Sequence, residues 1–99
     1  MDQKDKSKQP SIRQLEYFVS IAMSSNFRKA AQKLNISQPT LTSQIATLED
    51  ALGVKLFERS RAGTLLSPEG RELLPIVRQL LEQFQQVIDQ ADSSNRELS

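Results

Sequence analysis

The sequence predicts a mainly α-helical domain that carries one small β-hairpin. Three observations support this fold class. Apolar residues recur at helical spacing in four separate segments, and a residue that favours helix N-termini precedes each segment. A short stretch of β-compatible residues, interrupted by a glycine turn, follows the third segment. The chain has 99 residues and a hydrophobic content of 37%, so it can form one small core.

A polar tail precedes the first predicted helix. Residues 1–10 contain no apolar periodicity, and we expect them to be disordered. Ser11 and Gln14 have the spacing of a capping box, in which each side chain bonds the backbone N–H of the other residue. Apolar side chains then repeat at intervals of three and four residues, which predicts a helix over about 12–24.

A second, short helix is predicted between Asn26 and Asn35. Asn26 can cap its N-terminus, and Asn35 tolerates the left-handed conformation in which many helices end. The small pair Ala30-Ala31 allows another helix to cross closely over this one. Because only a tight turn separates this helix from the next, the two are predicted to form a helix-turn-helix.

The helix that begins after Ser37 has the pattern of a DNA-recognition helix. Ser37 is a favourable N-cap, and proline is tolerated in the first turn that follows it. One stripe is apolar and predicted to pack inward; it contains Leu41, Ile45, Leu48 and Leu52. The opposite stripe is short, mostly hydroxylated and free of carboxylates, so it can place hydroxyl groups against base edges; it contains Pro39, Thr40, Thr42, Ser43, Ala46 and Thr47. Taken alone, the pattern also fits an ordinary amphipathic helix.

A hairpin is predicted directly after this helix. Two extended runs, residues 56–59 and 64–66, flank a turn whose glycine permits a positive φ. The hairpin is the wing of a winged helix-turn-helix that spans residues 11–67. Arg59 and Arg61 lie on it, and we predict that they contact phosphates or an adjacent minor groove. The alternative is that both arginines are simply solvated.

Charge is distributed unevenly, although the formal net charge is only +1. Residues 28–67 carry six basic and three acidic side chains, a net charge of +3. Residues 68–99 carry three basic and six acidic side chains, a net charge of −3. This asymmetry suits a molecule that turns one face toward a polyanion. Arg28 and Lys29, near the start of the second helix, are therefore further predicted phosphate contacts.

A long helix is predicted over residues 68–90, with Ser67 as its N-cap and Pro68 in its first turn. Pro75 is expected to kink it, and residues 91–99 are expected to form a flexible end. Its apolar face is a heptad seam with a flanking row, wider than the small domain itself needs. We expect a homodimer through this face, bound to an interrupted inverted repeat, although packing within the chain is the alternative. The predicted interface contains Leu73, Val77, Leu80, Leu81, Phe84, Val87 and Ile88.

The composition excludes several classes of function. Without cysteine or histidine, the chain has no disulfides, no thiolate or imidazole metal site and no histidine-based catalysis. It has no glycine-rich phosphate loop or nucleophile–base pair, and the adjacent Glu49 and Asp50 point in different directions on a helix. We therefore expect no enzyme, no cofactor and no small-molecule ligand in this fragment. No apolar run suits a membrane span or a secretory signal, which favours the cytoplasm.

The order of helices and three sequence blocks resemble a known family. RQLEYFVSIAMSSNFRKAAQKLNI, then SQPTLTSQIATLEDALGVKLFER, and later SPEG are similar to the N-terminal DNA-binding domain of LysR-type transcriptional regulators. The resemblance covers about residues 12–88. It implies a bacterial, sequence-specific DNA-binding domain that dimerises through its long helix. Because the chain stops where the family's linker begins, the resemblance implies an isolated domain without the effector-binding domain.

Carried over residue by residue, the resemblance implicates the start of the recognition helix in major-groove contacts, at Gln38, Pro39, Thr40, Thr42 and Ser43. Two positions depart from the family pattern. Many members carry arginine where this chain has Ser43, and many carry a wing arginine where it has Ala62, one residue after Arg61. The alternative function is a winged-helix module that binds another protein and not DNA.

Overall fold

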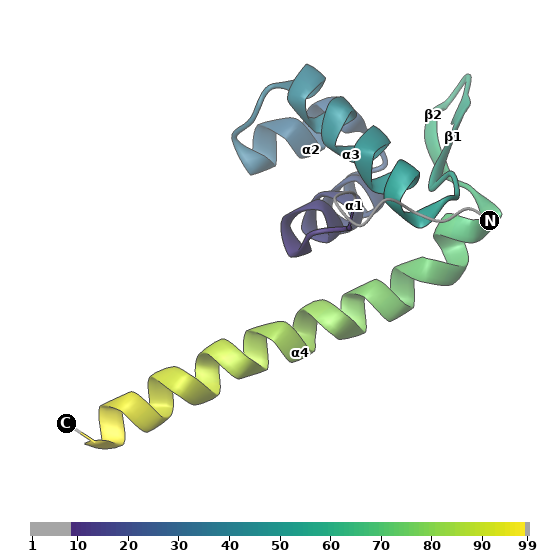
Figure 1. Ribbon diagram of the computed structural model, residues 1–99. Coiled ribbons are helices and arrows are strands. Elements are labelled where there is room, and N and C mark those ends of the chain that lie inside the picture. Colours follow the sequence, from purple (N-terminus) through teal and green to yellow (C-terminus); the bar gives the residue numbers. More distant parts are fainter. Residues whose placement is uncertain (1–8, 99) are drawn as a thin grey trace.

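The computed structural model describes residues 9–98 and contains, within that range, four helices and one two-stranded sheet. The elements in chain order are α1 (Ile12–Ser24), α2 (Phe27–Leu34), α3 (Gln38–Leu52), β1 (Phe57–Ser60), β2 (Gly63–Leu66) and α4 (Pro68–Leu98). Helices α1 to α3 form one body with the hairpin at its side, and α4 extends away as a long rod (Figure 1). This arrangement confirms the predicted winged helix-turn-helix with a long final helix. Most of the predicted disordered tail, residues 1–8, lies outside the described residues.

All four predicted N-caps are present. Ser11 and Gln14 form both bonds of the capping box, each 3.1 Å long. In the other three helices the side-chain oxygen of the cap accepts the backbone N–H of the residue three positions ahead. The distances are 2.9 Å between Asn26 and Lys29, 3.1 Å between Ser37 and Thr40, and 2.8 Å between Ser67 and Gly70. Each bond satisfies one backbone donor that the helix cannot satisfy itself.

The turn of the helix-turn-helix follows the predicted chemistry. Asn35 adopts the left-handed conformation at φ 61°, and its N–H bonds the carbonyl of Gln32 at 3.2 Å. Ala30 and Ala31 of α2 are buried, as are Leu41, Ile45 and Leu48 of α3. The small alanine side chains thus lie in the core where the two helices meet.

The wing, which we define as strands β1 and β2 with their turn, is anchored to the core by an aromatic cluster. Its register pairs Phe57 with Leu66 and Ser60 with Gly63, so the turn itself contains only two residues. Gly63 has a φ of 130°, as its predicted role requires. Phe57 makes edge-to-face contacts with Phe18 and Phe27, with both centroid distances at 5.6 Å. Such contacts hold the base of the hairpin against α1 and α2.

The predicted end of the long helix is wrong. Instead of stopping near Gln90, α4 continues through Pro75 and the polar segment to Leu98. The flexible end was predicted because residues 91–99 lack apolar periodicity, but extending an existing helix does not require a new nucleus. Alanine, arginine, glutamate and leucine in this segment also favour helix. The kink expected at Pro75 stays a prediction.

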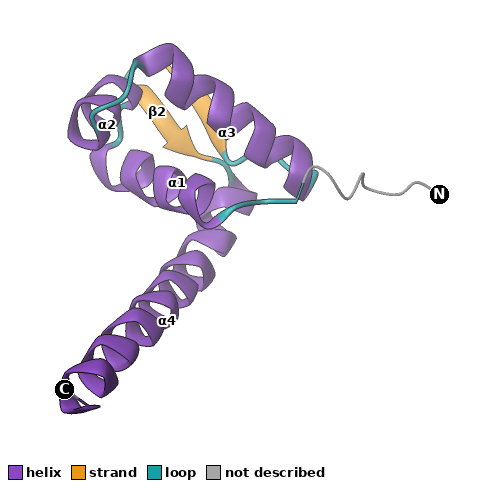
Figure 2. Cartoon of the chain, turned by 60° about the vertical axis from the view of Figure 1, so that its left-hand side comes forward, coloured by secondary structure: helices purple, strands orange, loops and turns teal. Residues whose placement is uncertain are grey.

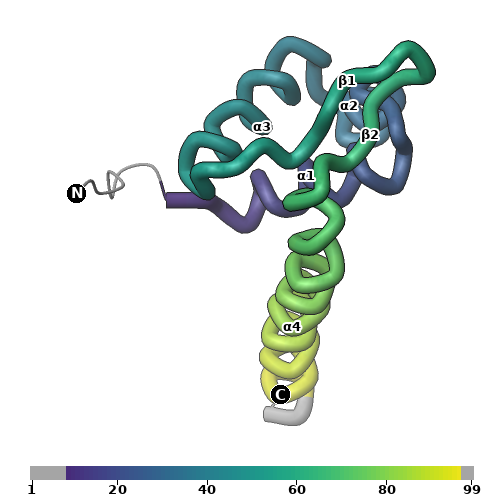
Figure 3. The backbone as a smooth tube through the Cα atoms, turned by 90° about the vertical axis from the view of Figure 1, so that its right-hand side faces the viewer, coloured from purple at the N-terminus to yellow at the C-terminus, as the bar shows by residue number. Residues whose placement is uncertain are grey.

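The predicted dimer face also needs correction, because its first part covers the chain's own core. Val77 is only 7% exposed and belongs to the core cluster, while Leu73 and Leu81 are partly buried against that cluster. Helix α4 begins beside α1 (Figure 2), so its first turns find their apolar contacts within the chain. The remainder of α4 projects from the body (Figure 3). The other predicted interface residues of α4, Leu80, Phe84, Val87 and Ile88, are exposed. None of the helices in the described range has the length and apolarity needed to cross a bilayer.

Candidate nucleic-acid interface

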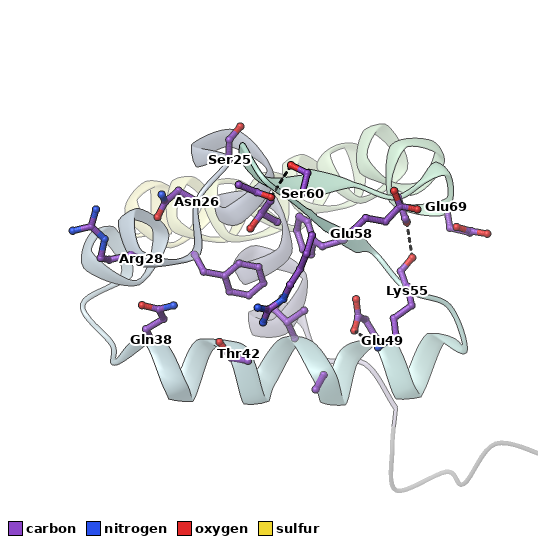
Figure 4. Close-up of a pocket in the computed structure, with 18 residues that line it drawn as sticks. Ser25, Asn26, Arg28, Gln38, Thr42, Glu49, Lys55, Glu58, Ser60 and Glu69 are labelled. Atoms are coloured by element: carbon purple, nitrogen blue, oxygen red, sulfur yellow. Dashed lines mark hydrogen bonds and ion pairs between the residues drawn. The ribbon is translucent and has the colours of Figure 1, made fainter.

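A cleft of about 800 Å³ separates the outer side of α3 from the wing and the start of α2. Four of the predicted contact residues line it, namely Arg28, Gln38, Thr42 and Arg59. Figure 4 shows Gln38 and Thr42 projecting from α3 into this space, with Arg28 at one end of it. The fold therefore gathers predicted site residues from three elements that are separated in the sequence.

The outer face of α3 is a shallow hollow without charged side chains. Gln38, Pro39, Thr42, Ser43 and Ala46 line this hollow, and all five are exposed. The hollow is as free of carboxylates as the sequence pattern predicted. A duplex can therefore approach it without meeting a like charge.

Two threonine hydroxyls on α3 already have partners within the helix. Ser37 Oγ accepts the N–H of Thr40 and donates to Thr40 Oγ1 at 2.8 Å, which leaves the hydroxyl hydrogen of Thr40 free to donate outward. Thr47 differs, because its hydroxyl donates to the carbonyl of Ser43 at 3.1 Å. Thr47 therefore presents its methyl group, and not a free donor, at the surface.

The four predicted phosphate contacts are exposed cations on α2 and on the wing, the two elements that face α3 across the cleft. Arg28 and Lys29 lie in the first turn of α2, Arg59 lies on β1, and Arg61 lies in the turn of the wing. None of the four makes an ion pair within the described part of the chain. Lys29 and Arg61 do not line the cleft. All four guanidinium or ammonium groups are thus available to an external anion.

Sequence reasoning missed two side chains whose hydrogen bonds connect α3 to other parts of the fold. The first, Gln14, is buried and donates from Nε2 to Gln44 Oε1 at 3.1 Å, which connects α1 to α3. The second, Glu49, lines the cleft and accepts the N–H of Leu56 at 2.8 Å. Both bonds join residues that belong to different elements or lie across a turn, so no local spacing signals them. The capping box predicted the bond between Gln14 Oε1 and the N–H of Ser11, but not the bond from Gln14 Nε2 to Gln44.

The comparison with protein families shows the family to which the chain belongs. The model described as "Bacterial regulatory helix-turn-helix protein, lysR family" matches residues 12–71. The chain belongs to this family. The matched range contains α1 to α3, the wing and the start of α4, so it covers every element that borders the cleft.

Curated relatives of this LysR-family chain are transcriptional regulators. It is 51% identical over 70 residues to the HTH-type transcriptional regulator TfdT of Cupriavidus pinatubonensis, an alignment that covers 71% of this chain and 31% of the relative. It is 46% identical over 78 residues to a probable hydrogen peroxide-inducible genes activator of Mycobacterium xenopi, covering 79% of this chain and 41% of the relative. The chain thus spans less than half the length of these relatives.

Solved structures share the fold over most of the chain. The DNA-binding domain of CbnR in complex with DNA has a TM-score of 0.79 at 38% identity and covers 85% of this chain and 97% of that chain. The DNA-binding domain of BenM with catB site 1 DNA has a TM-score of 0.80 at 36% identity, covering 84% of this chain and 93% of that chain. Oxidised OxyR of Corynebacterium glutamicum has a TM-score of 0.84 at 38% identity, covering 93% of this chain and 28% of that chain.

These comparisons confirm the predicted class, the DNA-binding domain of a LysR-type transcriptional regulator. The relatives are regulators and not enzymes. They give no support to the alternative of a winged-helix module that binds only protein.

Proposed function

We propose that this domain binds double-stranded DNA as a homodimer, with α3 in the major groove and the wing against the neighbouring backbone. One observation carries the proposal: the uncharged, exposed outer face of α3 adjoins a cleft that holds the unpaired Arg28 and Arg59. A face of this kind can read bases while the cations beside it hold phosphates.

Base reading is assigned to the exposed side chains on the outer face of α3. The Gln38 amide has the donor and acceptor that match the major-groove edge of adenine. The hydroxyls of Thr40, Thr42 and Ser43 can bond base edges, and Pro39 with the methyl group of Thr47 can contact thymine methyl groups. No arginine or lysine lies on this face, so the usual bidentate contact with guanine is not available from it.

Phosphate binding is assigned to Arg28, Lys29, Arg59 and Arg61, four cations that make no ion pair with the described residues. They lie at the start of α2 and on the wing, which face α3 across the cleft. Contacts from both elements would fix the orientation of α3 on the duplex while adding no base preference of their own.

The homodimer is assigned to the exposed part of α4. Leu80, Phe84, Val87 and Ile88 are exposed, and the described part of the chain leaves them accessible to a partner. Pairing this stripe with its copy would remove the apolar side chains from water and relate two α3 helices by a two-fold axis. The matching operator is an interrupted inverted repeat. Since bacterial DNA lies in the cytoplasm, we place the domain there.

Selection from a pool of random duplexes tests the proposal without knowledge of the operator. The enriched sequence should be an inverted repeat, and it should bind at least about 10³-fold more tightly than random DNA at moderate salt. Recovery of no common sequence, or equal affinity for selected and random duplexes, would contradict it.

A further inference from the structure

The root of the wing is held between α3 and α4 through the backbone of one buried residue, Leu56. Its N–H donates to Glu49 Oε2 of α3 at 2.8 Å. Its carbonyl accepts the N–H of Ser67, the cap of α4, at 2.9 Å. Leu56 directly precedes β1, so both bonds act at the point where the chain enters the wing.

The attachment to α4 is made from several tight contacts. Ser67 Oγ donates to the carbonyl of Lys55 at 2.6 Å and accepts the N–H of Gly70 at 2.8 Å. A Cβ atom added to Gly70 would lie only 2.2 Å from the carbonyl oxygen of Leu56. The first turn of α4 therefore packs directly on this backbone, and the wing root cannot shift easily on that side.

The polar attachment to α3, in contrast, depends on the side chain of Glu49. The carbonyl of Glu49 accepts the N–H of Gly53 at 2.7 Å, which closes α3, and its carboxylate then spans the following turn to reach Leu56. The Glu49 side chain is 14% exposed, whereas that of Lys55, whose Nζ lies 3.7 Å from Oε1, is 81% exposed. An ammonium group so well solvated contributes little to the pair. The bond to the Leu56 amide is therefore the main interaction of this carboxylate.

Glu49 lies where its negative charge disfavours the binding of phosphates. Its side chain lines the cleft that we propose faces the duplex, and it lies on the same helix that enters the groove (Figure 4). A carboxylate at this place repels phosphates. A favourable effect of Glu49 on DNA binding must therefore come from geometry and not from charge.

We propose that Glu49 is a positioning residue, which fixes the wing relative to α3 so that Arg59 and Arg61 reach phosphates when α3 occupies the major groove. This inference rests on the proposed DNA-binding function. Glu49 sets the α3 side of the wing root, while Ser67 and Gly70 set the α4 side. Without the carboxylate, the aromatic contacts of Phe57 keep the wing on the body, but its angle to α3 is no longer fixed.

Four variants separate positioning from charge and from folding. Glu49→Ala removes the acceptor and the charge, and Glu49→Asp keeps the charge but shortens the reach. Glu49→Gln keeps an acceptor oxygen without the charge. Asp50→Ala is the matched control, because Asp50 is an exposed carboxylate on the same helix that does not line the cleft. Circular dichroism and thermal unfolding establish which variants are folded.

The measurement is a double-mutant cycle on the selected operator, in which Arg59 and Arg61 are replaced by alanine in each background. In the wild type, and in Glu49→Gln and Asp50→Ala, this replacement should lower affinity roughly tenfold or more, as expected for two phosphate contacts. In Glu49→Ala and Glu49→Asp the same replacement should cost less than about twofold, because a displaced wing has already lost those contacts.

The outcomes distinguish the inference from the function on which it rests. An equal cost of the arginine replacement in all folded backgrounds overturns the positioning role of Glu49 and leaves DNA binding by the wing intact. No cost in the wild type shows that the wing makes no contact to position, which overturns the inference together with that part of the proposed function. If Glu49→Ala does not fold, Glu49→Asp supplies the same comparison.

Discussion

The Nε2 atom of Gln14 on α1 donates a hydrogen bond to Oε1 of Gln44 on α3 at 3.1 Å. The Oε1 atom of the same Gln14 amide accepts the N–H of Ser11 and so closes the capping box of α1. One buried amide thus uses both of its ends, one for the start of α1 and one for the middle of α3. The helix that we propose faces DNA is tied to the start of the first helix by this side chain.

Replacement of Gln44 by alanine should therefore destabilise the domain by about 1 kcal/mol, because it leaves the buried Gln14 amide with an unsatisfied donor. Urea unfolding followed by circular dichroism measures the change. Gln32→Ala is the control, since Gln32 is an exposed glutamine on α2. Equal stability of the two variants would show that water replaces the lost partner at no cost.

The crossing of α2 and α3 gives a second stability prediction. Ala31 is buried in the core, and Leu41, Ile45 and Leu48 of α3 are buried with it. Ala31→Leu should overpack this contact and cost about 1–3 kcal/mol. Ala46→Leu, on the exposed face of α3, should change thermal stability little. A thermally neutral Ala31→Leu variant would mean that the two helices do not meet as closely as described.

Features encoded within a few residues were predictable from the sequence, and features that depend on a distant partner were not. Asn26, Ser37 and Ser67 cap helices through bonds that span three residues, so the cap and its helix occur together in the sequence. The Glu49–Leu56 bond spans seven residues and a turn, and the Gln14–Gln44 bond spans thirty. No spacing rule connects such residues before the fold is known.

The same limit explains why the dimer face of the long helix was predicted incorrectly. A heptad seam shows that a face is apolar but does not name the surface that covers it. In α4 the chain's own core covers Val77, whereas Val87 remains 68% exposed.

For the candidate site, the sequence predicted the outer face of α3 and the wing arginines. It did not predict the cleft between them, because the cleft exists only once the wing folds back beside α3.

Specific recognition by α3 should depend on the hydroxyl of Thr40. Ser37 occupies its acceptor side, so the remaining hydrogen points to an external acceptor. Thr40→Val removes the hydroxyl and keeps the shape, and it should weaken binding to the selected operator by roughly 1–3 kcal/mol. Random DNA should be bound almost as well as before. Fluorescence anisotropy on both duplexes measures the ratio, and an equal loss on both would remove Thr40 from the base-reading residues.

The wing should act through electrostatics that depend on salt. Arg61 is exposed and makes no ion pair in the described part of the chain. If it binds a phosphate, Arg61→Ala should reduce the slope of log K against log salt by about one unit, because one fewer counterion is released. Arg78→Ala is the control, since Arg78 lies on α4 and contacts Met23. An unchanged slope would return Arg61 to the solvated-surface interpretation.

Assembly through α4 should be required for tight binding to the whole operator. Leu80 and Phe84 are exposed on α4, and glutamates at both positions would place like charges in the paired stripe. The double variant should sediment as a monomer at micromolar concentration, and its affinity should fall toward that for a single half-site.

The control for this prediction adds the same charge elsewhere on the same turns. Gln79→Glu with Gln83→Glu introduces two carboxylates at exposed positions beside the stripe, and this variant should remain dimeric. Because a dimer joins two half-sites, dimerisation and operator affinity should be lost together when the stripe is charged and retained together in the control. A wild-type domain that is monomeric under these conditions, yet binds the full inverted repeat tightly and without cooperativity, would contradict the proposed role of α4.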